Sequence, residues 1–277
     1  MAKPLLIVGN KRSGSTQFMQ LLNFNSNVFI SNESDIIWIL FQYFNDLEFK
    51  EFKWDDPKGM NNALEVAGMC LDKNKSIKEN FEDFQKEIMN KGMLKMPPME
   101  KDNLKYIGDQ KPFQNIAPEL MPFIVEHFPD AKFIHLVRHP FSVVQSSKNF
   151  AGGTGGYIWS GMTEEQLLER WTMHEKWVKE ARNKYDIDIL DVRYEDIIFK
   201  TEKTLKNVFD FLGLVIGSDE FKAMKKSTIK NVKWRKKLSV PNDTLLLMEE
   251  YGYSTKNWLL DYKLPAKAAH YFFRMIS

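Results

Sequence analysis

The segment best suited to chemistry is a loop rich in glycine and hydroxyl side chains at residues 9–16, G-N-K-R-S-G-S-T. The apolar run PLLIV at 4–8 precedes this loop, and helical spacing of apolar residues follows it from 15 to 22. A loop between a strand and a helix presents backbone N–H groups and the positive end of the helix dipole, which together bind phosphate or sulfate. The alternative interpretation is a simple helix start, in which Ser15 and Thr16 only cap the helix.

The position of the positive charge in this loop limits what it can bind. The loop is similar to the nucleotide-binding pattern G-x-x-x-x-G-K-[ST], but Ser15 stands where that pattern has lysine, and the cation is Arg12, with Lys11 beside it. A kinase needs that lysine, together with Mg²⁺, to manage the charge of the transferred phosphate. We therefore expect a less charged group, such as a sulfuryl group, which needs no metal. A P-loop small-molecule kinase is the alternative.

A second candidate anion site lies in residues 128–147, FPDAKFIHLVRHPFSVVQSS. Arg138 directly follows a strongly apolar strand, and ligands of α/β proteins bind at the carboxyl ends of such strands. Ser146 comes eight residues later, about two turns along the next helix, so the pair can flank one phosphate. Alternatively, Arg138 is a helix cap or a member of a surface ion pair.

Alternating strands and helices must position these residues. We expect strands at 4–8, 106–107, 131–137 and 187–192, and helices at 15–22, 35–44, 116–127, 140–150, 163–185 and 201–212. This order predicts an α/β protein with three layers, a parallel β-sheet flanked by helices, in a single domain spanning 1–277. Residues 46–103 are interpreted as an insertion of short helices and loops, a candidate lid over the acceptor. The basic segment 225–239 and the glycine-rich segment 151–161 are expected to be loops.

Composition excludes several classes of protein. Hydrophobic residues make up 43% and charged residues 27%, which is typical of a globular chain. The net charge of +2 argues against nucleic acid or a membrane as the main partner. The single cysteine, Cys70, excludes an internal disulfide framework and a four-cysteine metal site, and no His, Cys or Asp spacing suggests a metal. Because no apolar stretch is long enough for a signal peptide or a membrane span, a cytoplasmic location is expected.

Four segments in order, 4–22, 128–147, 190–214 and 227–239, resemble the sulfotransferases that use 3′-phosphoadenosine 5′-phosphosulfate (PAPS). The resemblance implies a P-loop NTPase-like sulfotransferase fold and the product 3′-phosphoadenosine 5′-phosphate (PAP). Residues 12–16 (Arg12, Ser13, Gly14, Ser15 and Thr16) match the family loop for the 5′-phosphosulfate. Arg138 and Ser146 match its 3′-phosphate motif, and His139 replaces an aspartate often found there. The resemblance also implies nucleotide contacts from Tyr194, Ser227 and Lys233, and a basic loop at 225–239 that folds over the nucleotide.

The resemblance also implies a general base. Some branches use a histidine, but this chain has none in the matching segment DQKPF, 109–113. The protein-tyrosine and glycan-type branches use a glutamate, and Glu33, 21 residues after Arg12, stands at the similar position. Lys111 resembles a lysine placed near the transferred group, so the expected catalytic residues are Glu33, Arg12 and Lys111. Alternatively, Glu33 is only a surface residue near a helix start.

The acceptor stays open at this level: a small molecule, a glycan or a peptide would each fit, and the sequence does not determine the oligomeric state. His174, on the long helix 163–185, is expected at the surface, with contact to the acceptor as the alternative. His127, His135 and His270 are expected to be structural, because they lie on or beside predicted core elements.

Overall fold

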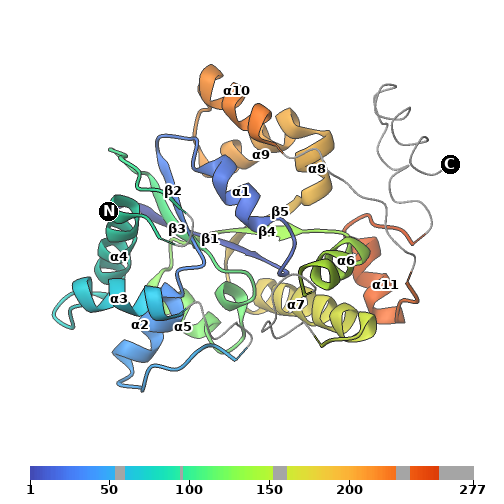
Figure 1. Cartoon of the computed structure of the whole chain (residues 1–277), viewed down its shortest axis with the longest axis horizontal. Helices are drawn as coiled ribbons and strands as arrows, with labels where there is room; N and C mark the ends of the chain where they lie inside the picture. Colours follow the sequence, from blue (N-terminus) through green and yellow to red (C-terminus); the bar gives the residue numbers. More distant parts are fainter. Residues whose placement is uncertain (54–59, 94–95, 152–160, 229–237, 256–277) are drawn as a thin grey trace.

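A five-stranded parallel sheet forms the centre of the protein. The computed structural model describes residues 1–53, 60–93, 96–151, 161–228 and 238–255. The strand order is β2-β3-β1-β4-β5, and every pair of neighbours is parallel (Figure 1). The strands are β1 (Lys3–Gly9), β2 (Val28–Asn32), β3 (Tyr106–Gln110), β4 (Lys132–Val137) and β5 (Asp188–Arg193). The predicted α/β class with a parallel sheet is therefore confirmed.

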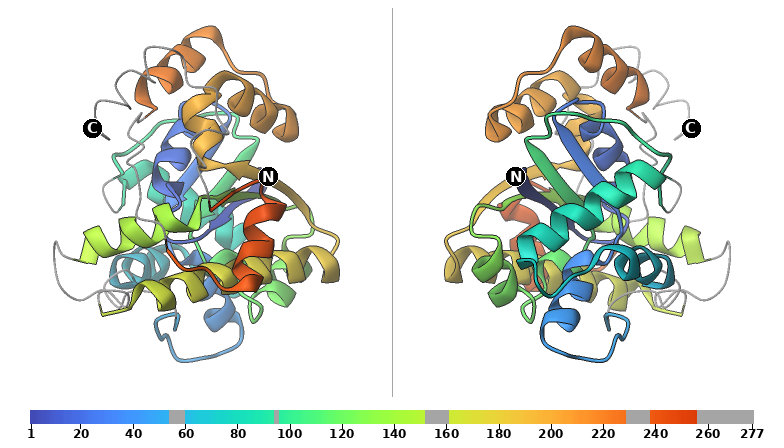
Figure 2. Two further views of the ribbon diagram at one scale, coloured as in Figure 1. Left: turned by 90° about the vertical axis from the view of Figure 1, so that its right-hand side faces the viewer. Right: turned by 90° about the vertical axis from the view of Figure 1, so that its left-hand side faces the viewer.

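Helices cover both faces of this sheet, which buries strands such as β1 and β4 on both sides. On one face lie α1 (Ser15–Leu22), α8 (Tyr194–Phe199), α9 (Thr201–Leu212) and α10 (Ser218–Ser227) (Figure 1). On the other lie α2 (Ile36–Phe44), α4 (Ile77–Lys91), α5 (Met121–His127) and α7 (Glu164–Lys184), and both views of Figure 2 place the sheet between the two groups. The remaining elements are α3 (Met60–Cys70), which packs on α2 and α4, the 3₁₀ turn η1 (Gln114–Ile116), and α6 (Pro140–Ala151) and α11 (Asn242–Glu250), which pack on α7.

The order of the strands gathers the candidate residues. β1 lies between β3 and β4, so the chain leaves β1 towards one side of the sheet and later returns to the other. Ligands of open α/β sheets bind at such a reversal, outside the carboxyl ends of the strands. The phosphate loop follows β1, Glu33 follows β2, Lys111 follows β3, and Arg138 follows β4. All four segments therefore begin at the carboxyl ends of the parallel strands, along the same edge of the sheet.

One strand was not predicted. Val28–Asn32 forms β2, at the edge of the sheet, and pairs with β3 in register from Val28 opposite Tyr106 to Asn32 opposite Gln110. Its three apolar residues are bordered by Asn and Ser on both sides, so the local pattern is that of a loop. The strand forms because β3 supplies its hydrogen-bonding partner.

The expected insertion contributes more to the core than its composition indicates. In α4, Ser76 and Glu79 form a reciprocal capping box at the helix start. Phe81, Phe84 and Ile88 of this helix are buried, and α4 packs on α2, β2 and β3. This helix therefore belongs to the layer that covers the sheet, and the lid function expected for 46–103 stays a prediction.

Lys101, near the end of the segment 46–103, is hydrogen-bonded to the backbone at the amino end of β2. The ammonium group of Lys101 donates to the carbonyl oxygens of Asn23 (2.6 Å), Asn25 (2.8 Å) and Val28 (2.5 Å). Two of these carbonyls belong to the turn that joins α1 to β2, and the third belongs to Val28, the first residue of β2. Lys101 therefore fixes the start of the strand that leads to Glu33.

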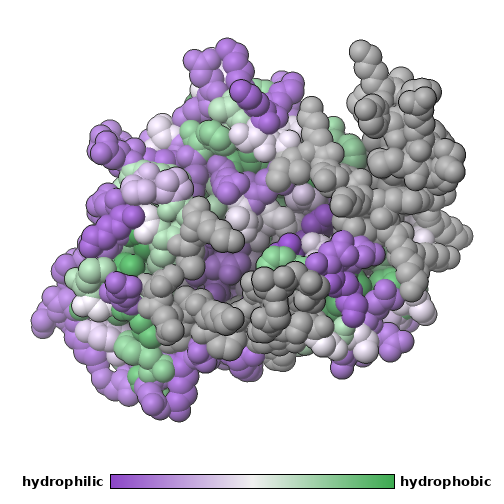
Figure 3. Space-filling model, in the orientation of Figure 1, coloured by the Kyte–Doolittle hydropathy of each residue, from purple (hydrophilic) through white to green (hydrophobic). Residues whose placement is uncertain are grey.

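On the face drawn in Figure 3, the described surface over α10 is mainly hydrophilic. Among the described residues, the exposed large apolar side chains are spread over separate elements: Met1, Phe24, Leu47, Phe49, Met69, Val215 and Leu246. Scattered single residues of this kind are ordinary in folded proteins. None of the helices in the described part of the chain combines the length and the apolar character needed to cross a bilayer.

Candidate active site

The phosphate loop is a tight turn between β1 and α1. The N–H group of Ser13 donates to the carbonyl of Asn10 (3.0 Å), and Phe18 donates to the carbonyl of Gly14 (3.0 Å) to begin the helix. Arg12 (φ 73°) and Gly14 (φ 95°) both have left-handed backbone conformations. Turns with such residues place successive N–H groups around one concave spot, which binds anions.

Gly14 is required by a close neighbour as well as by its backbone angle. A Cβ atom at this position would lie 2.2 Å from Cε2 of Tyr194, the first residue of α8. The Tyr194 hydroxyl donates to Oε1 of Gln17 (3.2 Å) in α1. Tyr194, predicted as a nucleotide contact, is thus packed directly on the loop.

Replacing Gly14 with alanine is expected to lower the free energy of unfolding by about 1–3 kcal/mol, the usual cost of overpacking a tight site. Denaturation in urea measures this loss. Gly68→Ala is the matched control, because a Cβ at Gly68 would have no neighbour within 4 Å. An equally stable Gly14→Ala variant would mean that the loop and Tyr194 are not held together as described.

Arg12, Arg138 and Ser146, predicted from separate motifs, meet at this loop. Nη1 of Arg138 donates to the carbonyl of Arg12 (2.9 Å), and the Arg138 guanidinium lies 4.3 Å from the centroid of the Tyr194 ring. Nε of Arg12 donates to Oγ of Ser146 (3.3 Å) in α6, and the guanidinium of Arg12 lies 4.2 Å from the centroid of the Phe150 ring. Two cations and a hydroxyl therefore border the same turn.

Two buried polar atoms of this group make no hydrogen bond among the described residues. They are Oγ of Ser13, whose side chain is fully buried, and Nε of Arg138, a residue 9% exposed. Buried polar groups are normally satisfied, and an unsatisfied one at a candidate site suits a bound ligand. Ser15 differs, since its Oγ accepts a hydrogen bond from Nε2 of Gln110 (2.8 Å), and Thr16 is exposed.

Glu33 lies at the same edge as the loop. Its N–H group donates to the carbonyl of Gln110 (2.9 Å), directly after β2, and its side chain is half-buried. Strands in a sheet are about 4.8 Å apart and β3 lies between β2 and β1, so Glu33 follows a strand about 10 Å from β1. Glu33 (φ 54°) and Asp35 (φ 55°) have left-handed backbone conformations, a strain that proteins retain mainly at functional positions.

Lys111 is held in a buried ion pair that the sequence did not predict. Its Nζ lies 2.7 Å from Oδ1 of Asp35, and the two side chains are 4% and 5% exposed. Gln114 also donates to Oδ1 of Asp35 (2.8 Å). The pair joins the residue after β3 to the segment that carries Glu33, so Lys111 lies at the carboxyl edge of the sheet with Asp35 as its acidic partner.

Ser227 and Lys233, the other predicted nucleotide contacts, are not placed at the phosphate loop by any contact of the described residues. Ser227 is the exposed last residue of α10. Lys233 and most of the basic segment, 229–237, lie outside the described residues, as does most of the glycine-rich segment 151–161. Their roles stay predictions.

His139 has a structural role that sequence reasoning missed. Its Nδ1 accepts a hydrogen bond from the N–H group of Phe141 (3.2 Å), and its Nε2 donates to the carbonyl of Ser254 (3.1 Å). Burial lowers the pKa of His139 to about 4, so the ring is neutral and caps the first turn of α6. Its backbone N–H also donates to Glu195 (3.1 Å), a buried carboxylate that accepts from the Tyr253 hydroxyl (2.6 Å).

His174 corrects an expectation. It is fully buried rather than at the surface, with its ring centroid 4.9 Å from that of Phe113. His135 is also fully buried, as predicted for a core strand.

A small cavity borders the phosphate loop on the side of α6 and α7. Its lining residues are Asn10, Lys11, Phe113, Val143, Ser147, Leu167 and Arg170. The guanidinium of Arg170 lies 4.6 Å from the centroid of the Phe113 ring. This cavity offers both an aromatic surface and positive charge beside the candidate anion site.

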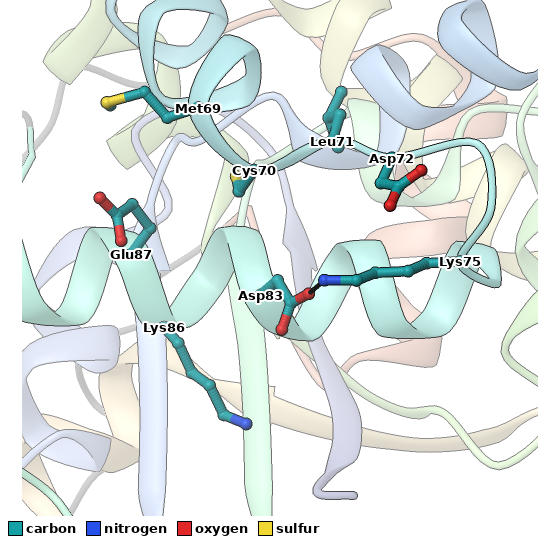
Figure 4. A pocket seen from close by; sticks show the side chains of 8 residues that line it. All are labelled: Met69, Cys70, Leu71, Asp72, Lys75, Asp83, Lys86 and Glu87. Carbon is teal, nitrogen blue, oxygen red and sulfur yellow. Dashed lines mark hydrogen bonds and ion pairs between the residues drawn. The ribbon is translucent and has the colours of Figure 1, made fainter.

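A larger cavity, about 620 Å³, lies between α3 and α4 and includes no residue of the strand ends (Figure 4). Charged side chains surround it, including the Lys75–Asp83 ion pair drawn in Figure 4. Burial and the charge of Glu87 raise the pKa of Cys70 to about 11, so its thiol stays protonated. A protonated thiol is a poor nucleophile, and no residue of the four motifs lines this cavity.

Comparison with known proteins assigns the family. A model of the sulfotransferase family matches residues 4–217. Mouse Sulfotransferase 2A1 is 31% identical over 136 residues, which cover 42% of this chain and 47% of that protein. The chain thus spans about half the length of this curated relative.

Solved structures show the same fold. The sulfotransferase domain from the curacin biosynthetic pathway superposes with a TM-score of 0.59 at 17% identity, covering 92% of this chain and 99% of that one. The sulfotransferase from Alicyclobacillus acidocaldarius gives a TM-score of 0.55 at 15% identity, covering 94% of this chain and 100% of that one. Since the family model spans most of the chain and the fold agrees, the chain belongs to the sulfotransferase family.

Proposed function

We propose that the protein transfers a sulfuryl group from PAPS to a hydroxyl or amine of an acceptor, with Glu33 as the general base. The observation that carries this proposal is the meeting of Arg12, Gly14, Arg138, Ser146 and Tyr194 around one turn. These residues come from three separate motifs of the PAPS-dependent pattern, and the first and last of them, Arg12 and Tyr194, are 182 positions apart in the chain.

The donor would lie across the carboxyl edge of β1 and β4. The loop N–H groups of residues 13–16 and Arg12 suit its 5′-phosphosulfate, and Arg138 with Ser146 suits its 3′-phosphate. The buried Oγ of Ser13 and Nε of Arg138, which have no hydrogen-bond partner among the described residues, are free to contact these groups. Tyr194, Ser227 and Lys233 are proposed as further contacts to the nucleotide.

In the proposed reaction, Glu33 accepts the proton of the acceptor O–H or N–H group. The acceptor atom then bonds to sulfur while the bond from sulfur to the phosphate oxygen breaks, and PAP leaves. Arg12 and the loop N–H groups stabilise the negative charge that develops on the leaving phosphate. Lys111 is proposed to add positive charge near the sulfuryl group, from its place beside Asp35.

A P-loop kinase remains the alternative, and one contact argues against it. Ser15 occupies the position of the phosphate-binding lysine, and its hydroxyl is engaged by Gln110 within the protein. The acceptor of the proposed sulfuryl transfer is a small molecule, a glycan or a peptide. The glutamate-using branch, the independence from metal and the cytoplasmic location stay predictions.

Binding of PAP to the whole chain tests the proposal. We expect PAP to raise the melting temperature in the presence of EDTA, because a ligand that binds only the folded state stabilises it. ATP with Mg²⁺ should have little effect. A large stabilisation by ATP with Mg²⁺ and none by PAP would favour the kinase instead.

A further inference from the structure

Beneath the phosphate loop, the side chain of Asn10 is anchored to α7. Asn10, the first residue after β1, is 3% exposed. Its Nδ2 donates to Oε1 of Glu175 (2.7 Å) and to the carbonyl of Trp171 (3.4 Å). Because the Asn10 carbonyl also accepts the N–H group of Ser13, the same residue closes the turn and fastens it to the helix.

Glu175 is a fully buried carboxylate, and its charge is balanced by a chain of alternating charges. Nε2 of His135 lies 3.1 Å from Oε2 of Glu175, and Nδ1 of His135 lies 2.7 Å from Oδ1 of Asp191. Arg182 forms an ion pair with Asp191 near the surface. From the surface inward, the chain therefore runs from Arg182 to Asp191, His135 and Glu175, with alternating charge, and Glu175 contacts Asn10.

The ionisation of this chain agrees with its geometry. Burial alone would lower the pKa of His135, but the charge of Glu175 and the hydrogen bond with Asp191 outweigh burial and raise it to about 9. Burial alone would raise the pKa of Glu175, but the charge of His135 outweighs it and lowers that pKa. At neutral pH, His135 is thus an imidazolium and Glu175 a carboxylate.

We propose that Glu175 is a positioning residue for sulfuryl transfer, which holds Asn10 and so keeps the phosphate loop in its donor-binding conformation. This inference rests on the proposed function. The physical reason is that a hydrogen bond to a charged acceptor is about twice as strong as one to a neutral acceptor. The loop contains the strained backbone of Arg12 (φ 73°), which persists only where its surroundings hold it.

The same cluster could instead be read as a metal site, since ligand atoms of His135, His174 and Glu175 lie within 4.8 Å of one another. However, both ring nitrogens of His135 already lie beside carboxylates, Nε2 at 3.1 Å from Glu175 and Nδ1 at 2.7 Å from Asp191. The ionisable groups beside His135 are Glu175 and His174 from α7, Asp191 from β5, and Tyr251 after α11. Behind them on α7, Arg170 acts on His174 and Arg182 pairs with Asp191. The charge chain accounts for His135 and Glu175 with groups already present.

A remote variant tests the proposal in the full chain. Asp191→Asn removes the outer carboxylate without touching the loop and should lower the pH at which His135 loses its proton. We expect the alkaline limb of PAP affinity against pH to move at least one pH unit lower, and ¹⁵N NMR of the His135 ring to show the same displacement. Asp188→Asn is the matched control, because Asp188 lies on the same strand in an ion pair with Lys132.

Glu175→Gln and Asn10→Ala then test the hydrogen bond between Asn10 and Glu175. Each should weaken PAP binding about tenfold and speed hydrogen exchange of the Ser13 N–H group, and the double variant should be no weaker than either. Failure of the wild type to bind PAP would overturn the proposed function, whereas exchange at Ser13 and the His135 NMR signals report on the positioning role without the donor. Unchanged loop exchange in the two inner variants, or one bound metal ion per purified chain, would overturn the positioning role.

Discussion

Replacing Glu33 with glutamine is expected to lower turnover by about 10²–10⁴-fold, the usual contribution of a positioned general base. Glutamine keeps the size and a hydrogen-bonding carbonyl of the side chain but cannot accept the acceptor's proton at neutral pH. Because Glu33 follows β2 and the loop follows β1, the affinity for PAP should be nearly unchanged. Steady-state assays with labelled PAPS, together with calorimetry of PAP binding, separate these two quantities.

The control for this variant is Glu250→Gln. Glu250 is an exposed residue at the end of α11 whose partner is Lys179, on the surface, so turnover and PAP affinity should both match the wild type. If Glu33→Gln instead loses PAP binding to the same extent as turnover, Glu33 stabilises the loop after β2 and is not the base.

Arg138→Ala is expected to weaken PAP binding by about 10–100-fold. A hydrogen bond to a charged group is worth about 1.5–3 kcal/mol, and each 1.4 kcal/mol is a factor of ten in affinity. The alanine also removes the contacts of Arg138 with the Arg12 carbonyl and with the Tyr194 ring, so the loop loses a support. Titration with PAP measures the change, and a melting curve shows that the variant is folded.

Two further variants make this result specific. Arg138→Lys keeps the charge but loses the planar group that stacks on Tyr194, and it should recover only part of the affinity. Lys86→Ala removes the positive charge of an exposed lysine on α4 and should leave the affinity unchanged. A PAP affinity that is the same in Arg138→Ala as in the wild type would contradict the assignment of the 3′-phosphate site.

Local pattern was sufficient to predict most of the fold. The run 131–137 and the segment 4–8 are apolar enough to be buried strands, and they form β4 and β1. Thr163 and Gln166 form the capping box that begins α7, at the start of the expected helix 163–185, and Gly213 (φ 64°) ends α9, directly after the expected helix 201–212. These signals are read within a few residues, so they need no knowledge of the remaining chain.

The misjudged elements are those whose stability comes from distant residues. β2 has only three apolar residues before Ser31 and Asn32, and it forms because β3 lies beside it. In α4, the charged and amide residues suggest a peripheral helix, but Phe81 and Phe84 face the core. The capping pattern Ser76 to Glu79 was the one local signal that could have identified this helix.

The amino-acid sequence by itself determined the strand-loop-helix order around Gly14, the placement of Arg138 after a buried strand, and the family pattern, because these depend on neighbouring residues. Only the tertiary structure decided that Arg12 meets Ser146, that Lys111 pairs with Asp35, and that Asn10 is anchored to Glu175. Such contacts follow from the strand order, which sets which loops share an edge, and many chain arrangements are compatible with the same local pattern.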